Sequence, residues 1–474
     1  MISFSKKLIG RAKNMDMTSG GIMGKLIAFS LPLALSGILQ LLFNAVDRIV
    51  SGQFSETSRE SVAAVSSNNA LISLIINVSL GLSVGANVVV AHAIGSHNKE
   101  KAQNAVHTAI LTSIICGVTV GLIGALCARY FLVWMKTDAN VIDKATTYLS
   151  IYFIGAPANI VYNFGAAILR AKGDTKRPLI FLALAGVINA CLNLILVKFA
   201  HMDVAGVAVA TIVSQYISVV LVIITLMREK DYCKLNLKKL RIKKRELLDI
   251  LRIGLPSGIL SSFFSVANVI IQSSVNGFGD AVMAGNGVGA SLEAFVYTSM
   301  NAVSSATTTF AGQNVGAKRY DRIKSILLDS CIVTLFISVV LGAFIYFLGR
   351  PLAGLYTTDP VVVDYAIDRM KVILPIYFIC GMVENVVGCL RGMNYAIGPM
   401  IPSFLSVCAY RIIWVYTAFK STPTTFMLYL SYPISWVINL ILDVALFAYA
   451  YNKFIRLKKP MRDDSKILEY ARVG

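Results

Sequence analysis

A carboxylate stands inside a long apolar segment near the start of the chain. The stretch LLFNAVDRIV (41–50) places Asp47 and Arg48 directly after twenty residues that carry a single charge. Adjacent residues on a helix point about 100° apart, so Arg48 is poorly placed to pair with Asp47. Gln40 and Asn44, at i−7 and i−3, share the face of Asp47. Because a carboxylate at membrane depth costs at least about 2.5–3.5 kcal/mol, we expect this polar stripe to face a cavity or other helices.

Two later apolar segments carry amide and hydroxyl groups at helical spacing. Asn189 and Asn193 are four residues apart in AGVINACLNLILV, as are Thr211 and Gln215 in GVAVATIVSQ. One carboxylate with several neutral oxygens is a ligand set typical of hard cations. The alternative is that the neutral groups form interhelical hydrogen bonds of modest strength, and that Asp47 only fixes helix packing.

Polar and acidic side chains also occur in the apolar segments of the second half. Glu293 and Glu384 are deep enough to line a cleft, with packing as the alternative, and Asp443 is expected either to pack between helices or to pair with Arg411. Met300 belongs to a set of Met, Phe and Tyr side chains that can bind flat or cationic ligands, or simply fill the core. The candidate cavity residues are Gln40, Asn44, Gln215, Asn268, Gln272, Glu293, Met300 and Glu384.

The composition places these groups in a polytopic membrane protein. The 474 residues are 56% hydrophobic and 15% charged, whereas about 25% charge is usual in soluble proteins. A span needs about 20 apolar residues. The sequence predicts twelve transmembrane helices near 25–50, 62–90, 104–128, 147–169, 178–200, 204–227, 250–275, 284–311, 325–348, 372–390, 400–419 and 427–451.

The basic residues are distributed unevenly between the connections. Most of the 44 Lys and Arg fall in the termini and in the connections after even-numbered spans. By the positive-inside rule both termini are then cytoplasmic. The net charge of +19 is thereby explained by topology and anionic lipid rather than by nucleic acid. The expected division is an N-terminal segment (1–24), an N-lobe (25–227), a basic linker (228–249), a C-lobe (250–452) and a tail (453–474).

The two halves of the chain repeat the same short motifs in the same order. AHAIGSHNKEKAQ (91–103) corresponds to GQNVGAKRYDRIK (312–324), and ILRAKGDTKRP (168–178) to CLRGMNYAIGP (389–399), each 221 residues apart. With six spans per half, both halves enter from the same side, so the repeat is parallel. The fold class we expect is all-α, with twelve transmembrane helices in two six-helix lobes and a cleft between them.

These motifs resemble the multidrug and toxic compound extrusion (MATE) family. The matching stretches are MTSGGIMGKLIAFSLPLALSGILQLLFNAVDRIVSGQ (17–53), ILRAKGDTKRPLIFLALAGVINACLNLILV (168–197), TFAGQNVGAKRYDRI (309–323) and LRGMNYAIGP (390–399). The resemblance implies an antiporter that expels amphipathic, often cationic, compounds in exchange for inward H⁺ or Na⁺ by alternating access.

The same resemblance implies a cation site in the first lobe. It falls on Asp47, Asn189, Asn193 and Thr211, but the family pattern has Asp at the position of Asn193. A site with one carboxylate holds Na⁺ less tightly. Desolvation disfavours the charged form of a carboxylate, so proton exchange at Asp47 is slightly favoured.

Other functions remain as alternatives or are disfavoured. A flippase for lipid-linked precursors, from the same superfamily, is the main alternative, although Arg48 and Arg411 are the only basic residues expected within spans. We find no nucleophile–base set, no zinc-protease motif and no P-loop, so an enzyme is not expected. The eight scattered cysteines suggest neither disulfides nor metal. We expect a monomer in the inner (plasma) membrane, with no cofactor beyond the coupling ion.

Overall fold

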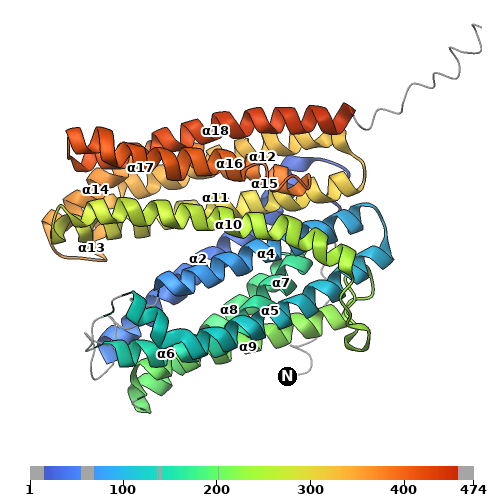
Figure 1. Cartoon of the computed structure of the whole chain (residues 1–474), viewed down its shortest axis with the longest axis horizontal. Coiled ribbons are helices and arrows are strands. Elements are labelled where there is room, and N and C mark those ends of the chain that lie inside the picture. The colour runs from blue at the N-terminus through green and yellow to red at the C-terminus, as the bar shows by residue number, and fades with distance from the viewer. Residues whose placement is uncertain (1–14, 55–68, 136, 138–140, 201, 457–474) are drawn as a thin grey trace, which may run out of the picture.

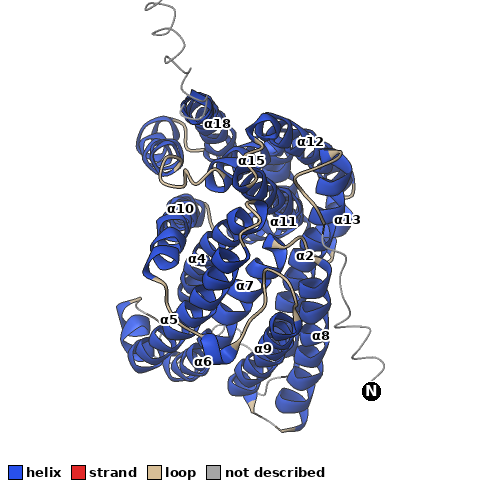
Figure 2. Cartoon of the chain, turned by 90° about the vertical axis from the view of Figure 1, so that its right-hand side faces the viewer, coloured by secondary structure: helices blue, strands red, loops and turns tan. Residues whose placement is uncertain are grey.

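The computed structural model describes residues 15–54, 69–135, 137, 141–200 and 202–456. Within these ranges every regular element is a helix (Figure 2). The expected all-α class is therefore confirmed.

The helices of the first half include one π-helical turn and one bent pair. The π-helix η1 continues α8 without a break, and α6 and α7 meet at an angle of 43°. A short 3₁₀ turn, η2 (Leu237–Lys239), lies in the linker. The order is α2 (Ile22–Phe54), α4 (Asn69–Gly95), α5 (Lys99–Trp134), α6 (Ile142–Ile154), α7 (Ala156–Ala171), α8 (Lys176–Asn193), η1 (Leu194–Phe199) and α9 (Asp203–Arg228).

The second half repeats this plan with more interruptions. Two of its spans are assembled from several short helical pieces. The order is α10 (Lys244–Asn276), α11 (Asp280–Gly316), η3 (Tyr320–Arg322), α12 (Ile323–Phe347), α13 (Gly349–Gly354), α14 (Pro360–Ile373), η4 (Leu374–Ile376), α15 (Tyr377–Gly392), α16 (Met400–Ser403), η5 (Phe404–Ala409), α17 (Tyr410–Trp414), η6 (Val415–Phe419) and α18 (Thr425–Arg456).

The long apolar helices account for nearly all of the expected spans. Among the described residues ten helices are long and apolar enough to cross a membrane, or eleven when the bent α6–α7 pair counts as one span. The remaining expected span coincides with α11, which is 37 residues long and rich in Gly, Ser, Thr and Asn. Much of its surface is buried against other helices, which permits this more polar composition.

The helices form two lobes, with α4–α9 in the lower part of Figure 1 and α11–α18 in the upper part. The first helix of each half belongs to both lobes. The first turns of α2 pack in the core of the second lobe, where the Phe29 and Phe310 rings lie edge to face at 5.8 Å. The first turns of α10, through Ile250 and Ile253, pack in the core of the first lobe. The lobe boundaries 25–227 and 250–452 therefore stay predictions.

The lobes touch closely at the end where the linker joins α9 to α10, which we call the linker end. Here α4 crosses α10 at glycines: a Cβ on Gly81 would lie 2.3 Å from the backbone nitrogen of Gly258, and one on Gly85 would lie 2.2 Å from the carbonyl oxygen of Ile250. These distances are too short for any side chain. The crossing therefore requires glycine.

A buried ion cluster fixes the start of the linker to the first lobe. Glu229 accepts hydrogen bonds from Lys172 and from Arg177 Nη2 (2.6 Å), and Arg177 also pairs with Asp174. Burial alone would raise the pKa of Glu229, but the hydrogen bonds and charges of Lys172 and Arg177 outweigh it and lower the pKa. The linker therefore packs as a part of the first lobe.

Candidate cation site and its surroundings

Three of the predicted site residues form a hydrogen-bonded cluster between α8 and α9. Asn193 donates its Nδ2 to Asn189 Oδ1 (3.2 Å), and Asn189 donates to Thr211 Oγ1 (3.3 Å). Thr211 donates to the Val207 carbonyl (2.9 Å). The side chains of Asn189 and Asn193 are 4% and 0% exposed. The i, i+4 spacing read from the sequence thus brings amide and hydroxyl oxygens together inside the first lobe.

The segment of α2 that carries Asp47 packs beside this cluster. The side chain of Asp47 lies outside the described residues, but its backbone belongs to α2. One turn earlier, the Phe43 ring occupies the space next to Gly186, where a Cβ would lie 1.8 Å from the ring. Val46 packs on an apolar cluster that includes Val197 and Val207. The backbone of Asp47 therefore lies at the level of Asn189 and Thr211.

The backbone changes its helical type immediately after this cluster. Asn193 is the last residue of α8, and the chain continues as the π-helix η1. Such turns in a helix are often found at functional sites, because the widened turn redirects the side chains around it. No pattern in the sequence indicates this change.

The other candidate residues of the first lobe are more accessible. Gln40 and Asn44 are exposed on α2, and Gln215 on α9 is half-buried.

In the second lobe Glu293 is held in an ion pair. Its two carboxylate oxygens accept from Arg369 Nε (2.9 Å) and Nη2 (2.7 Å), and Arg369 Nη1 donates to Asn286 Oδ1 (2.7 Å). Glu293 and Arg369 are both buried. The rings of Tyr429 and Tyr432 lie 5.4 and 5.3 Å from the guanidinium carbon of Arg369. Glu293 is thus a buried partner of Arg369 in this structure.

Glu384 and Met300 belong to the same lobe. Glu384 is half-buried and accepts from the Tyr297 hydroxyl (3.4 Å). Met300 is 0% exposed and belongs to an apolar core cluster. The structure therefore places Met300 in the apolar core, which is the second of the two roles that the sequence indicates for it.

The expected pair between Asp443 and Arg411 is wrong. Arg411 instead donates to Ser435 Oγ (3.0 Å) and Asn268 Oδ1 (3.2 Å), and its guanidinium lies 4.2 Å from the centre of the Tyr432 ring. Neither carboxylate oxygen of Asp443 has a hydrogen-bond partner among the described residues. Sequence reasoning matched opposite charges without knowing which helix faces they occupy.

Two exposed amides of the candidate cavity set lie on α10. Asn268 binds Arg411, and Gln272 accepts from Asn286 Nδ2 (2.9 Å) and donates to Asn276 (2.9 Å). These hydrogen bonds connect α10 to the Arg411 and Arg369 groups of the second lobe.

Arg369 was missed because the tenth span begins earlier than its apolar run. The sequence predicts 372–390, whereas the helical span starts at Pro360. Its first turns carry Asp364, Asp368, Arg369 and Lys371, which lower the local hydropathy. The expectation that Arg48 and Arg411 are the only basic residues within spans is therefore wrong.

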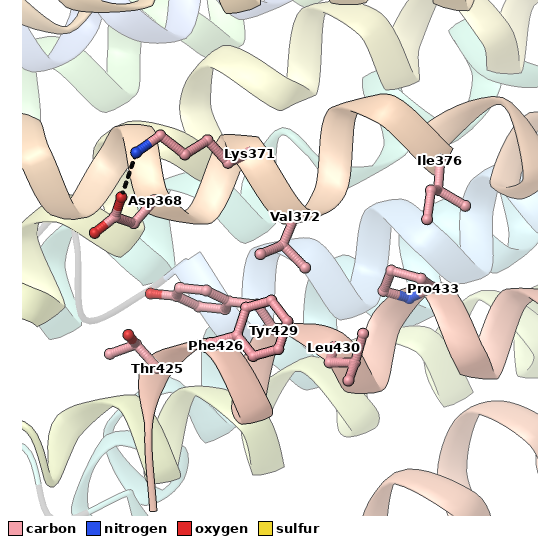
Figure 3. A pocket seen from close by; sticks show the side chains of 9 residues that line it. All are labelled: Asp368, Lys371, Val372, Ile376, Thr425, Phe426, Tyr429, Leu430 and Pro433. Carbon is pink, nitrogen blue, oxygen red and sulfur yellow. Dashed lines mark hydrogen bonds and ion pairs between the residues drawn. The ribbon is translucent and has the colours of Figure 1, made fainter.

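A cavity of about 410 Å³ lies between α14 and α18 (Figure 3). The ion pair of Asp368 and Lys371 (2.9 Å) stands on its α14 side. None of the candidate cavity residues lines it. The lining residues are Asp368, Lys371, Val372, Ile376, Thr425, Phe426, Tyr429, Leu430 and Pro433.

Together, the long apolar helices, the two lobes with repeated motifs and the buried oxygen cluster define an integral membrane protein of the internally repeated transporter type. Comparison with known proteins specifies this class. A model of the MatE family matches residues 32–195 and 256–417, one region in each half. The chain belongs to the MATE family of multidrug efflux transporters.

Individual relatives and structures agree with this assignment. "Probable multidrug resistance protein YoeA" of Bacillus subtilis (strain 168) is 26% identical, covering 91% of this chain and 93% of that protein. A "FAD transporter" of Shewanella oneidensis is 25% identical, covering 81% and 84%. A solved structure described as the outward-facing conformation of a multidrug resistance MATE family transporter has a TM-score of 0.85 at 21% identity, covering 95% of this chain and 100% of that one. The structural likeness confirms the two-lobed fold.

Proposed function

We propose that this protein is a secondary antiporter of the inner membrane that exports amphipathic, often cationic, small molecules in exchange for inward H⁺ or Na⁺. It works as a monomer, with both termini in the cytoplasm. The observation that carries the proposal is the buried Asn189–Asn193–Thr211 cluster beside the α2 segment that bears Asp47. It supplies oxygen ligands in the lobe where an ion must bind.

In this mechanism the coupling ion binds at Asp47 and its neighbours and favours a conformation that holds the substrate less well. Linkage makes the effect reciprocal: bound substrate weakens ion binding by the same factor. The neutral amides orient the carboxylate and share the charge of the ion. With a single carboxylate among these ligands, we favour H⁺ as the coupling ion.

The test is substrate efflux by purified protein in liposomes under separately imposed pH and sodium gradients. Asp47→Asn should abolish ion-driven efflux while the protein still inserts and folds. Asp143→Asn, at an exposed carboxylate of the same lobe that pairs with Arg129, is the matched control and should keep the coupling. Efflux at the normal rate in Asp47→Asn would show that Asp47 is structural.

The substrate panel should contain an organic cation, which belongs to the proposed substrate class, and an anionic nucleotide, because one relative is named a "FAD transporter". Export of the cation alone would support the proposed substrate class. Movement of a lipid-linked precursor without an ion gradient would favour the flippase alternative.

A further inference from the structure

Several side-chain hydrogen bonds join the lobes, among them that from Thr309 Oγ1 to Asn87 Oδ1 (3.1 Å), and two of them reach a helix end at the linker end. On α4, His92 Nε2 lies 2.7 Å from the carbonyl oxygen of Gly392, at the end of α15 in the second lobe. On α11, Gln313 donates its Nε2 to the carbonyl oxygen of Ala171, at the end of α7 in the first lobe (2.7 Å). Each bond runs from one lobe to the other, in opposite senses.

The internal repeat relates these two bonds to each other. Gln313 follows His92 by 221 residues, and Gly392 follows Ala171 by the same interval. This interval is the one that separates the repeated motifs of the two halves. The two donors therefore occupy equivalent places in the two halves, and so do the two acceptors. A chance contact would explain one such hydrogen bond but not both.

Both acceptors are carbonyl groups that a helix leaves without a donor. Ala171 and Gly392 are the last residues of α7 and α15, and the last carbonyls of a helix have no intrahelical partner. The amides that follow Ala171 donate to Ile168, Leu169 and Arg170 instead, and those after Gly392 turn back in the same way. Each helix end is thus capped by a side chain from the opposite lobe.

Two glycines bring the donors close enough to make these caps. A Cβ on Gly95 would lie 2.0 Å from the carbonyl oxygen of Gln313, and a Cβ on Gly316 would lie 2.2 Å from that of His92. The backbones of α4 and α11 therefore touch at the donor residues themselves. These two glycines are also 221 residues apart.

We propose that His92 and Gln313 are positioning residues for the transport cycle: a symmetry-related pair of latches that holds the lobes together at the linker end. The role in transport rests on the proposed function. To expose a cleft at this end, the lobes must break both bonds and give two helix termini to water. Without the two donor side chains, the joined state loses these hydrogen bonds and the separated state loses nothing. The equilibrium therefore shifts toward the separated state.

The first test measures the distance between the lobes. Spectroscopic labels at Glu100 and Asp321, exposed residues at the linker end of each lobe, can be introduced as non-canonical amino acids, which leaves the eight cysteines unchanged. His92→Ala and Gln313→Ala should each shift the ratio of short to long distances by about tenfold, the scale of one hydrogen bond. The double variant should shift it by more than either.

Two further variants separate a latch from general damage. His92→Gln installs the side chain found at the equivalent place in the other half, so it should restore the short distance. His107→Ala is the matched control, because His107 Nε2 accepts from the Asn236 amide on the linker without reaching the second lobe. It should leave the distance unchanged.

The outcomes distinguish the latch from the proposed function. Unchanged distances in the folded double variant overturn the latch, whatever happens to transport. Shifted distances with rescue by His92→Gln support it even if no substrate is exported, in which case the antiport proposal alone fails. Equal shifts in His107→Ala would mean general loosening and would also overturn the latch.

Discussion

At the scale of single residues, Asn193 is the proposed cation-site residue for which the resemblance to the MATE family implies Asp. It is fully buried and donates to Asn189. Asn193→Asp restores a second carboxylate with almost no change in volume. We expect stronger dependence of efflux on a sodium gradient, because a second carboxylate adds negative charge to the ligand set and so binds Na⁺ more tightly.

The measurement is the rate of efflux under a sodium gradient relative to that under a pH gradient. Asn193→Leu, of similar size but without oxygen ligands, should reduce coupling to both ions. An unchanged ratio in Asn193→Asp would remove this residue from the ion site.

Two of the ion pairs of α14 contrast in burial and therefore in their contribution to stability. Arg369→Met leaves the buried Glu293 without its partner and should destabilise the fold by about 3–5 kcal/mol. Lys371→Ala removes an ion pair whose side chains are half-exposed, which should cost less than about 1 kcal/mol. Thermal unfolding in detergent compares them. Similar losses for both variants would contradict this ranking.

Most of the candidate first-lobe site could be predicted, and most of the second-lobe chemistry could not. The spacing of Asn189 and Asn193 determines a shared face in any helix, so their contact follows from periodicity alone. The partner of Arg411 depends on the rotation of three separate helices, which no local pattern specifies. Arg369 was not predicted to lie within a span because the charged residues around it lower the local hydropathy. In the sequence such a stretch resembles the end of a span.

At the scale of helices, the crossing of α4 and α10 has no space for a side chain at Gly81. Gly81→Val should therefore force the helices apart and reduce the folded yield by well over tenfold, since the colliding atoms belong to the backbone of Gly258. Gly24→Ala, on an open face of α2, is the control and should be neutral or slightly stabilising. Size-exclusion profiles after detergent extraction report the outcome.

The ion cluster at the start of the linker should respond to pH through Glu229. Its pKa is lowered in the folded state, so its stabilising charge is fully present above the ordinary range of Glu, near 4.3, and is lost as the pH falls below that range. Glu229→Gln should destabilise the protein at neutral pH, and the gap to the parent should narrow on acidification. Unfolding followed between pH 3 and 7 in detergent, values chosen to span this range, checks the sign (about 1.4 kcal/mol per unit of lowered pKa). A gap that widens in acid would exclude the assignment.

Helix boundaries show which parts of the fold the sequence could specify. The apolar runs predicted the position of nearly every span, because lipid demands hydrocarbon over about 20 residues. The span predicted at 284–311 coincides with α11, which tolerates polar residues because much of its surface is buried against other helices. No sequence pattern predicts the π-helices η5 and η6, because they depend on how neighbouring helices pack.

At the scale of the whole molecule, the repeat predicted two lobes but not how they join. The sequence indicates six spans per half, and the structure shows that α2 and α10 each begin in one lobe and end in the other. Residues 221 apart then make equivalent contacts across the interface between the lobes. Such pairing between halves arises only from the folded arrangement.

The exchange of α2 and α10 between the lobes is the geometry of a domain-swapped dimer whose two subunits are joined in one chain. Neither half covers its own core completely, because part of that core packs against the first helix of the other half. A chain severed within residues 235–243 should consequently reassemble from its two pieces when they are made together, while either piece made alone should leave an apolar flank uncovered and be degraded. Such a six-span piece would also be drawn toward a second copy of itself, which offers a physical route from a small homodimeric ancestor to the present fused molecule.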